Sequence, residues 1–245
     1  MCRLLGVVVN KPDEFSSTLE QFKEKFSEKN ADGWGIGWYE NDIAQIFKEE
    51  IPAHDPTSHL NRLSKEVKSQ IIIAHVRKLS HGPPSEVNSH PFRVHKWLFA
   101  HNGIVDRDHL YSLLDIKYQK QLKGETDSEV YFYWLLQNIE NHKNDVIKGI
   151  KDAIQEVIRD NFTGVNFLLS DGTNLYAFRY SKSPQDAYTL YKLIQHTSNS
   201  NENAVFVCSE PLTEEKWDEI KFGHLLIVRK NLDLSEVQII DPLSS

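Results

Sequence analysis

The chain has 245 residues, of which 40% are hydrophobic and 11% aromatic, so it can bury a sizeable core and is not a disordered protein. Its formal net charge of −7 argues against a general nucleic-acid-binding protein. No segment approaches the roughly 18 apolar residues of a membrane helix, and the apolar N-terminal stretch is too short for a signal peptide. Two cysteines imply no disulfide framework. We therefore expect a cytoplasmic protein with no nucleic-acid or membrane partner, in which residues 1–245 form a single domain.

The first hundred residues are expected to form strands with one early helix. Strands are predicted by runs of β-branched and other apolar residues at 3–9, 33–39, 43–47, 70–76 and 97–100. Aromatic and leucine residues at helical spacing predict an amphipathic helix over 14–28. The glycines at 33, 35 and 37 could also belong to a phosphate-binding loop, but they lack the Lys-Ser/Thr ending and open no helix.

Helices are expected in the middle of the chain and strands after it. Helices are predicted from Asp106 to Leu114, from a cap at Thr126 or Asp127 onward, and over 144–159. Short apolar segments predict strands at 165–169, 175–179, 188–193, 205–208 and 225–228. An Asp-Gly pair at 171–172 predicts the hairpin turn between the first two. Strands, then helices, then strands favour one layered α+β domain over alternating βαβ units.

The second residue is a cysteine that follows the only methionine. Removal of Met1 would leave Cys2 with a free α-amine on the carbon that carries its thiol side chain. An α-amine titrates near about 8 and a thiol near about 8.5, so one residue would hold both a base and a nucleophile. A cysteine at this position can equally be a chance residue before a strand, and the sequence does not establish that Met1 is removed.

The segment from 75 to 127 offers the other groups that a thiolate attacking an amide needs. Asn102 can donate a side-chain N–H to an oxyanion, and Gly103 an unobstructed backbone N–H. The α-carboxylate of a glutamine-like substrate suits the guanidinium of Arg77, and its α-ammonium suits the carboxylate of Asp127. Each residue also has a structural explanation: an Asn-Gly turn, an ion-paired arginine and a helix cap.

Together these motifs resemble the class II glutamine amidotransferases, whose glutaminase domains use an N-terminal nucleophile. The motifs occur in the family's order: Met-Cys at 1–2, Asp-Gly-Trp-Gly at 32–35, His-Val-Arg at 75–77, His-Pro at 90–91, His-Asn-Gly at 101–103 and Thr-Asp-Ser-Glu at 126–129. Ser-Glu-Pro-Leu at 209–212 further resembles the stand-alone branch of the family. The resemblance implies a four-layer αββα sandwich of two antiparallel sheets, the fold of N-terminal-nucleophile hydrolases.

The resemblance also implies roles for individual residues. Cys2 would attack the γ-glutamyl carbonyl, and Asn102 and Gly103 would form the oxyanion hole. Arg77 and Asp127 would hold the carboxylate and the ammonium of the glutamyl group. A thioester to the nucleophile would follow and be hydrolysed by water.

The same resemblance implies one further substrate contact and shows one position at which this sequence differs from the family. Ser80 falls where the family has a small hydroxyl residue near the substrate, and Leu79 stands where the family usually has alanine. Neither a cofactor nor a metal is expected. The second cysteine, Cys208, is expected to be a buried strand residue without a role.

Other interpretations remain open at this stage. Six histidines between 75 and 109 invite a metal site, although no HExxH pattern or zinc-finger spacing is present. The chain could be a γ-glutamyl-binding module without activity. It could also be a glutaminase subunit that passes ammonia to a separate synthase, rather than a hydrolase that acts alone on glutamine or another γ-glutamyl compound.

Overall fold

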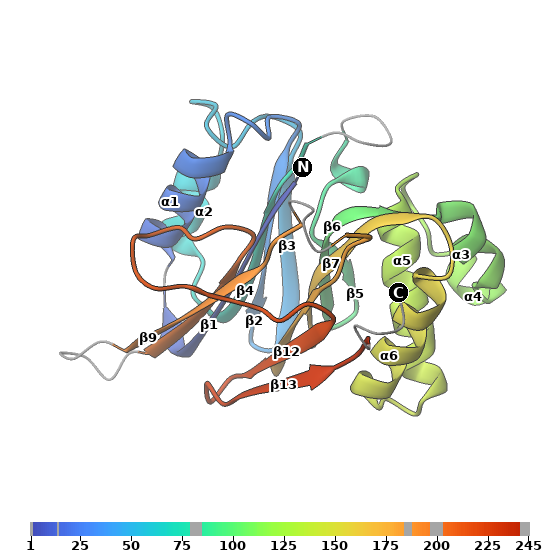
Figure 1. Ribbon diagram of the computed structural model, residues 1–245. Coiled ribbons are helices and arrows are strands. Elements are labelled where there is room, and N and C mark those ends of the chain that lie inside the picture. Colours follow the sequence, from blue (N-terminus) through green and yellow to red (C-terminus); the bar gives the residue numbers. More distant parts are fainter. Residues whose placement is uncertain (1, 14, 79–84, 184–187, 197–202, 241–245) are drawn as a thin grey trace.

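The computed structural model describes residues 2–13, 15–78, 85–183, 188–196 and 203–240. Within these residues, two antiparallel sheets pack face to face and helices cover both outer faces (Figure 1). This arrangement confirms the expected four-layer αββα sandwich. No helix of the described residues combines the length and the apolar character needed to cross a membrane.

The first sheet carries the N-terminal strand near its middle. Its strands are β1 (Arg3–Asp13), β2 (Trp34–Glu40), β3 (Ile43–Glu49), β4 (Ser69–Val76), β9 (Tyr191–His196), β10 (Asn203–Cys208) and β11 (Asp218–Glu219). They lie in the order β11-β9-β10-β1-β4-β2-β3, and α1 (Ser16–Phe26) and α2 (Leu60–Glu66) lie on the outer face (Figure 1). Strand β1 pairs on both sides, with Leu5 opposite Cys208 of β10 and Ala74 of β4. The backbone that leads into β1 is therefore fixed by two neighbours.

The second sheet lies under the larger group of helices. Its strands are β5 (Phe92–Val94), β6 (Trp97–Val105), β7 (Phe162–Ser170), β8 (Asn174–Arg179), β12 (His224–Arg229) and β13 (Leu234–Gln238). They lie in the order β13-β12-β8-β7-β6-β5. The covering helices are α3 (Arg107–Leu113), α4 (Ile116–Gln119), α5 (Asp127–Asn141) and α6 (Val146–Val157), and a 3₁₀ turn, η1, spans Glu86–Asn88. Strand β6, which is followed in the chain by α3, packs against helix α5.

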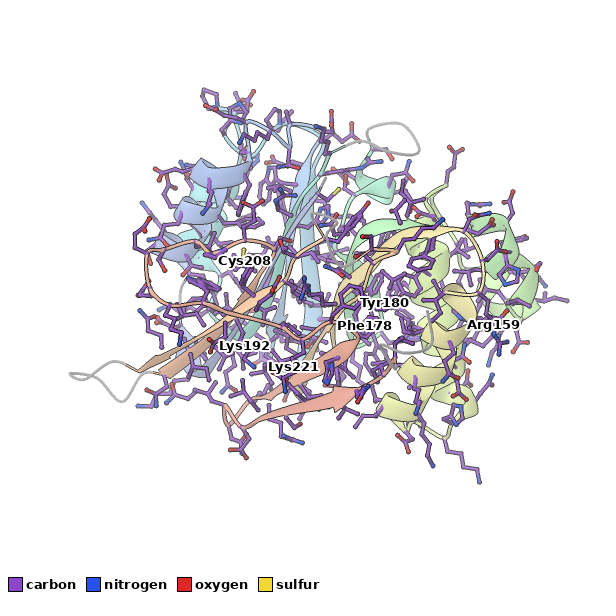
Figure 2. The ribbon with its side chains drawn as sticks, in the orientation of Figure 1. Arg159, Phe178, Tyr180, Lys192, Cys208 and Lys221 are labelled. Atoms are coloured by element: carbon purple, nitrogen blue, oxygen red, sulfur yellow. The ribbon has the colours of Figure 1, made fainter. Side chains whose placement is uncertain are left out.

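Alternation of side chains along the strands separates the apolar core into layers. Leu4 faces the space between the sheets, where Leu168 and Ala177 of the second sheet meet it. Cys208 belongs to the core between the first sheet and α1, whereas Phe178 belongs to the core between the second sheet and α5 and α6. The two therefore lie on opposite sides of the sandwich (Figure 2). As expected, Cys208 is a fully buried strand residue.

The order of strands and helices agrees with the sequence prediction, but several boundaries were wrong. The strand predicted at 97–100 continues to Val105, so residues 101–103 lie in strand β6 rather than in a loop. Asparagine and glycine have low strand propensity, and pairing with β7 overrides it. Helices α2 and α4 and strands β5, β11 and β13 were not predicted. The glycines at 33–37 enter and line strand β2, which excludes the phosphate-binding loop.

Candidate active site

The Cys2 sulfur lies against the backbone that follows strand β4. It is 3.3 Å from the N of Lys78, which donates to it, and 3.4 Å from the O of Lys78, to which the thiol can donate. Burial raises the pKa of the Cys2 thiol and Asp127 adds to this, whereas the Lys78 N–H and the Arg77 guanidinium act in the opposite direction. The thiol is consequently protonated near neutral pH and requires a base before it can attack.

Arg77 is held by a glycine turn that starts strand β2. Its backbone N donates to Gly33 O at 2.8 Å, and Asp32 N donates to its backbone O at 3.1 Å. Gly33 has a φ of +115°, and a Cβ at this position would lie 2.8 Å from the O of Glu49, so the turn needs glycine. Burial lowers the pKa of the Arg77 guanidinium, and the charges of Cys2 and Asp32 oppose that shift. This electrostatic contribution of Asp32 was not predicted from the sequence.

Asp127 joins the first turn of α5 to strand β6. The cap of α5 is Thr126, whose hydroxyl accepts the N–H of Glu129 at 3.3 Å. Asp127 is thus the first helical residue, and its Oδ2 accepts the N–H of Val105 at 2.9 Å. The carboxylate is therefore not used as a helix cap, which was the structural explanation considered for it. It is 6% exposed and ties the helix to the strand that carries the His-Asn-Gly motif.

Asn102 and Gly103 lie where the pairing of β6 with β7 loses its regular register. Gly103 has a φ of +150°, and a Cβ there would lie 1.7 Å from Gly164 O, so only glycine fits. The next amide, of Ile104, donates to the Thr163 side chain at 3.1 Å instead of continuing the ladder. Asn102 is 2% exposed, and its Nδ2 makes no hydrogen bond to the described residues. A buried amide donor therefore remains available beside the irregular strand end.

Three histidines near the candidate site residues are buried, namely His75, His90 and His101. His101 contacts Gly164 O through Nε2 at 3.2 Å and the hydroxyl of Ser128 through Nδ1 at 2.9 Å. Because a carbonyl only accepts, Nε2 carries the proton and Nδ1 accepts from Ser128. This contact fixes the residue next to Asp127, a connection that the sequence did not reveal.

The other two buried histidines contact each other. The rings of His75 and His90 have centroids 4.3 Å apart, and their nitrogens form no hydrogen bond of normal geometry within the described chain. Burial lowers the pKa of His75 to about 3 and that of His90 well below its ordinary value. All three histidines are therefore neutral at pH 7, since burial also lowers the pKa of His101. No group of three or more His, Cys, Asp or Glu side chains in the described part of the chain could hold a metal ion.

The Ser-Glu pair at 209–210 anchors the backbone of the N-terminal strand. The Ser209 hydroxyl accepts the N–H of Leu4 at 2.9 Å, and Ser209 N donates to Leu4 O at 3.0 Å. Glu210 forms an ion pair with Arg3, and Arg3 also donates to Cys2 O at 3.0 Å. These contacts hold the backbone of residues 2–4, which carries the cysteine. They give the Ser-Glu-Pro-Leu motif at 209–212 a structural role.

The structure brings together most of the residues expected from the sequence. Arg77 and Asp127 both act electrostatically on the Cys2 thiol. The bond from Val105 to Asp127 brings the strand with residues 102–103 into the same region. Ser80 and Leu79 lie outside the described residues.

Comparison with known proteins identifies the family. Residues 1–240 match the family described as glutamine amidotransferases class-II. An uncharacterized protein of Methanocaldococcus jannaschii is 31% identical over 94% of this chain and 69% of its own length. The putative glutamine amidotransferase YafJ of Escherichia coli is 30% identical over 91% of this chain and 95% of its own. A gamma-glutamyl-hercynylcysteine sulfoxide hydrolase of Mycolicibacterium smegmatis is 27% identical over 84% and 82% of the two chains.

A solved structure has the same fold. The glutamine aminotransferase class-II domain protein of Silicibacter pomeroyi superposes with a TM-score of 0.72 at 24% identity, covering 97% of this chain and 99% of that one. The family match extends over nearly the whole sequence, well beyond the motifs of its first half. This chain belongs to the class II glutamine amidotransferases, a family of amide-cleaving enzymes.

Proposed function

We propose that this chain hydrolyses the γ-glutamyl amide bond of glutamine or of another γ-glutamyl compound through a thioester on Cys2. The observation that carries the proposal is that the Cys2 sulfur contacts the backbone of Lys78, next to Arg77, and that the charge of Asp127, from the start of α5, raises the pKa of the Cys2 thiol. A guanidinium and a carboxylate at one site suit the α-carboxylate and α-ammonium of a glutamyl group. The site therefore favours substrates whose glutamyl head is a free α-amino acid.

Activation of the thiol depends on the N-terminus. Once Met1 is removed, the α-amine of Cys2, directly or through a water, takes the thiol proton. The Lys78 carbonyl accepts a hydrogen bond from the thiol, and the Lys78 N–H donates to the thiolate once it forms. The sulfur thus keeps a backbone partner in both protonation states, and the base compensates for the raised pKa.

Attack of the thiolate on the amide carbonyl produces a negatively charged oxygen. The Asn102 Nδ2 is a buried donor that lacks a partner among the described residues, so it can serve this oxygen without first breaking a bond. We assign the backbone N–H of Gly103 as the second donor. Ammonia or an amine then leaves, and water hydrolyses the γ-glutamyl thioester.

A second candidate function is a glutaminase that delivers ammonia to a separate synthase. The YafJ relative carries the name putative glutamine amidotransferase, whereas the mycobacterial relative is named as a hydrolase of a γ-glutamyl compound. Ammonia and glutamate release should therefore be assayed with glutamine and with several γ-glutamyl peptides, with and without cell extract. Hydrolysis by the purified chain supports the proposal, and activity that requires extract supports the second candidate.

Cys208 provides a matched control for the nucleophile. It is fully buried, and burial raises the pKa of its thiol to about 12, so it should not react. Cys2→Ala should abolish turnover and covalent labelling by an electrophilic glutamine analogue, while Cys208→Ala keeps both. Intact mass first verifies that Met1 is absent from the protein used. Substantial turnover by folded Cys2→Ala protein would refute the mechanism, and processed protein that never labels would indicate a binding module.

A further inference from the structure

A cavity lies on the side of the sandwich formed by β3, β5 and the connection from α4 to α5. Its volume is about 550 Å³, within the range of small-molecule sites. The apolar part of its wall includes Phe92, Phe132 and Tyr133. The strands β3 and β5 belong to different sheets and contact each other here, so the cavity is built by the packing of the two sheets. No residue of the proposed catalytic set lines it.

The charged part of the wall is positive although the chain as a whole is acidic. Lys48, Arg93, Lys120 and Lys123 line the cavity, and none of them forms an ion pair with another described residue. The carboxylates of Glu86 and Glu129 line the cavity as well. Four cations thus face two anions in a protein whose net charge is −7. Clustered cations without carboxylate partners are typical of sites that bind an anion.

Lys48 is the most constrained of these cations. Its ammonium donates to Ser89 O at 2.9 Å and lies 5.4 Å from the centre of the Phe92 ring. A Cβ on Gly35 would lie 2.9 Å from the Lys48 side chain, so this glycine makes room for the lysine stem. Burial lowers the pKa of Lys48 to about 8, and the charges of nearby glutamates only partly oppose this. A bound anion would stabilise the charged ammonium as these glutamates do, and would raise its pKa.

The loop that carries Lys123 is also fixed in place. Both carboxylate oxygens of Glu129 accept backbone N–H groups, from Lys123 at 3.0 Å and from Gly124 at 2.7 Å. The carboxylate is thus used to shape the loop and forms no bond to a side-chain cation of the cavity. The loop backbone at Lys123 is therefore preformed, so binding of an anion has to order only the lysine side chain.

We propose that this cavity binds a small organic anion, whose phosphate or carboxylate group contacts Lys48 and Lys123 and whose apolar part rests on the aromatic wall. Residues of the cavity lie close in the chain to the candidate active site: Ser89, which accepts the hydrogen bond of Lys48, precedes the buried His90, and Glu129 follows Asp127 by two residues on α5. The anion is therefore either an acidic group on the amine portion of the substrate or a separate molecule that binds beside the site.

Calorimetric titration with inorganic phosphate at constant ionic strength tests the site without any need for turnover. Saturable binding is expected in the full chain, and Lys123→Gln and Lys48→Gln should each weaken it about tenfold by removing a charge-assisted contact. Lys65→Gln, an exposed lysine on α2, is the matched control and should bind like the unaltered chain. Because Lys123 is exposed, its variant should fold even if the Lys48 variant does not.

Kinetic assays then distinguish the two sources of the anion. If Lys123→Gln raises KM for γ-glutamylglycine but not for glutamine, the anion belongs to the substrate amine. If phosphate binding weakens and neither KM changes, the anion is a separate molecule. Absence of saturable phosphate binding, or equal binding by Lys123→Gln and Lys65→Gln, would overturn the proposal. The titration decides this even if the chain proves to have no amidase activity.

Discussion

The buried histidines should make the stability of this protein depend on pH, and His75 permits a quantitative test. Burial lowers its pKa to about 3, whereas an unfolded histidine titrates near about 6.5. Above pH 6.5 the ring is neutral in both states, and its linkage contribution to stability is fully present. Below that pH only the unfolded chain takes up the proton, so stability falls as the pH is lowered towards 3.

The magnitude follows from the two pKa values. Each pH unit between them costs about 1.4 kcal/mol per histidine, so lowering the pH from 7 to 5 should remove about 2 kcal/mol through His75 alone. Other groups titrate over this range as well, and the informative quantity is therefore a difference between variants. We expect His75→Gln to lose about 2 kcal/mol less free energy of unfolding than the unaltered chain between the two pH values.

Urea unfolding at pH 7 and pH 5 measures this difference directly. His95→Gln, at an exposed position outside the buried cluster, is the control and should lose as much stability as the unaltered chain. His90 contacts His75 and stays in place, so its own contribution persists in the His75 variant. Equal losses by His75→Gln and the unaltered chain would mean that His75 is protonated in the folded protein, contrary to the argument from burial.

Three further substitutions test the candidate active site. Gly103→Ala would place a Cβ 1.7 Å from Gly164 O at a φ of +150°. We therefore expect a loss of several kcal/mol in unfolding free energy, or no folded protein, and a melting temperature near that of the unaltered chain would contradict this. Ser209→Ala leaves the buried Leu4 N–H without its side-chain acceptor, which should cost about 1–3 kcal/mol in chemical denaturation; a change below 0.5 kcal/mol would speak against it. Asp127→Asn should raise KM for γ-glutamyl substrates at least about tenfold with a smaller effect on kcat, and an unchanged KM would remove Asp127 from substrate binding.

The parts of the fold that could be predicted are those determined by interactions between residues close together in the sequence. Asp106 and Thr126 cap helices because their side chains accept amide hydrogens three residues on. The Asp-Gly pair at 171–172 makes its hairpin because Gly172 takes a φ of +84°. Helix α2 was missed because its seven residues bury only Leu60, Leu63 and Ser64, too few for a clear period. The chain order of motifs predicted the candidate site only through resemblance to a family.

The rest depends on contacts between segments far apart in the chain. Nothing in the local sequence places the ring of His75 against that of His90, or Lys48 in a cavity with Lys123. The strand position of Asn102 was missed for the same reason, since pairing with β7 overrides its low strand propensity. The local sequence reports the secondary-structure propensity of each residue, whereas these positions are determined by tertiary contacts with distant segments.

The bond between Val105 and Asp127 connects two of the family motifs in space. Taken singly, an aspartate at a helix start suggests a cap and an Asn-Gly pair suggests a turn. In the fold Thr126 supplies the cap, and the Asp127 carboxylate instead holds the strand end just beyond Gly103. A substitution that moves this carboxylate would therefore disturb both the proposed ammonium contact and the proposed oxyanion donors. Because the carboxylate accepts the backbone N–H of Val105, a change at residue 127 acts on both features, whereas a side-chain change at Asn102 leaves this hydrogen bond in place.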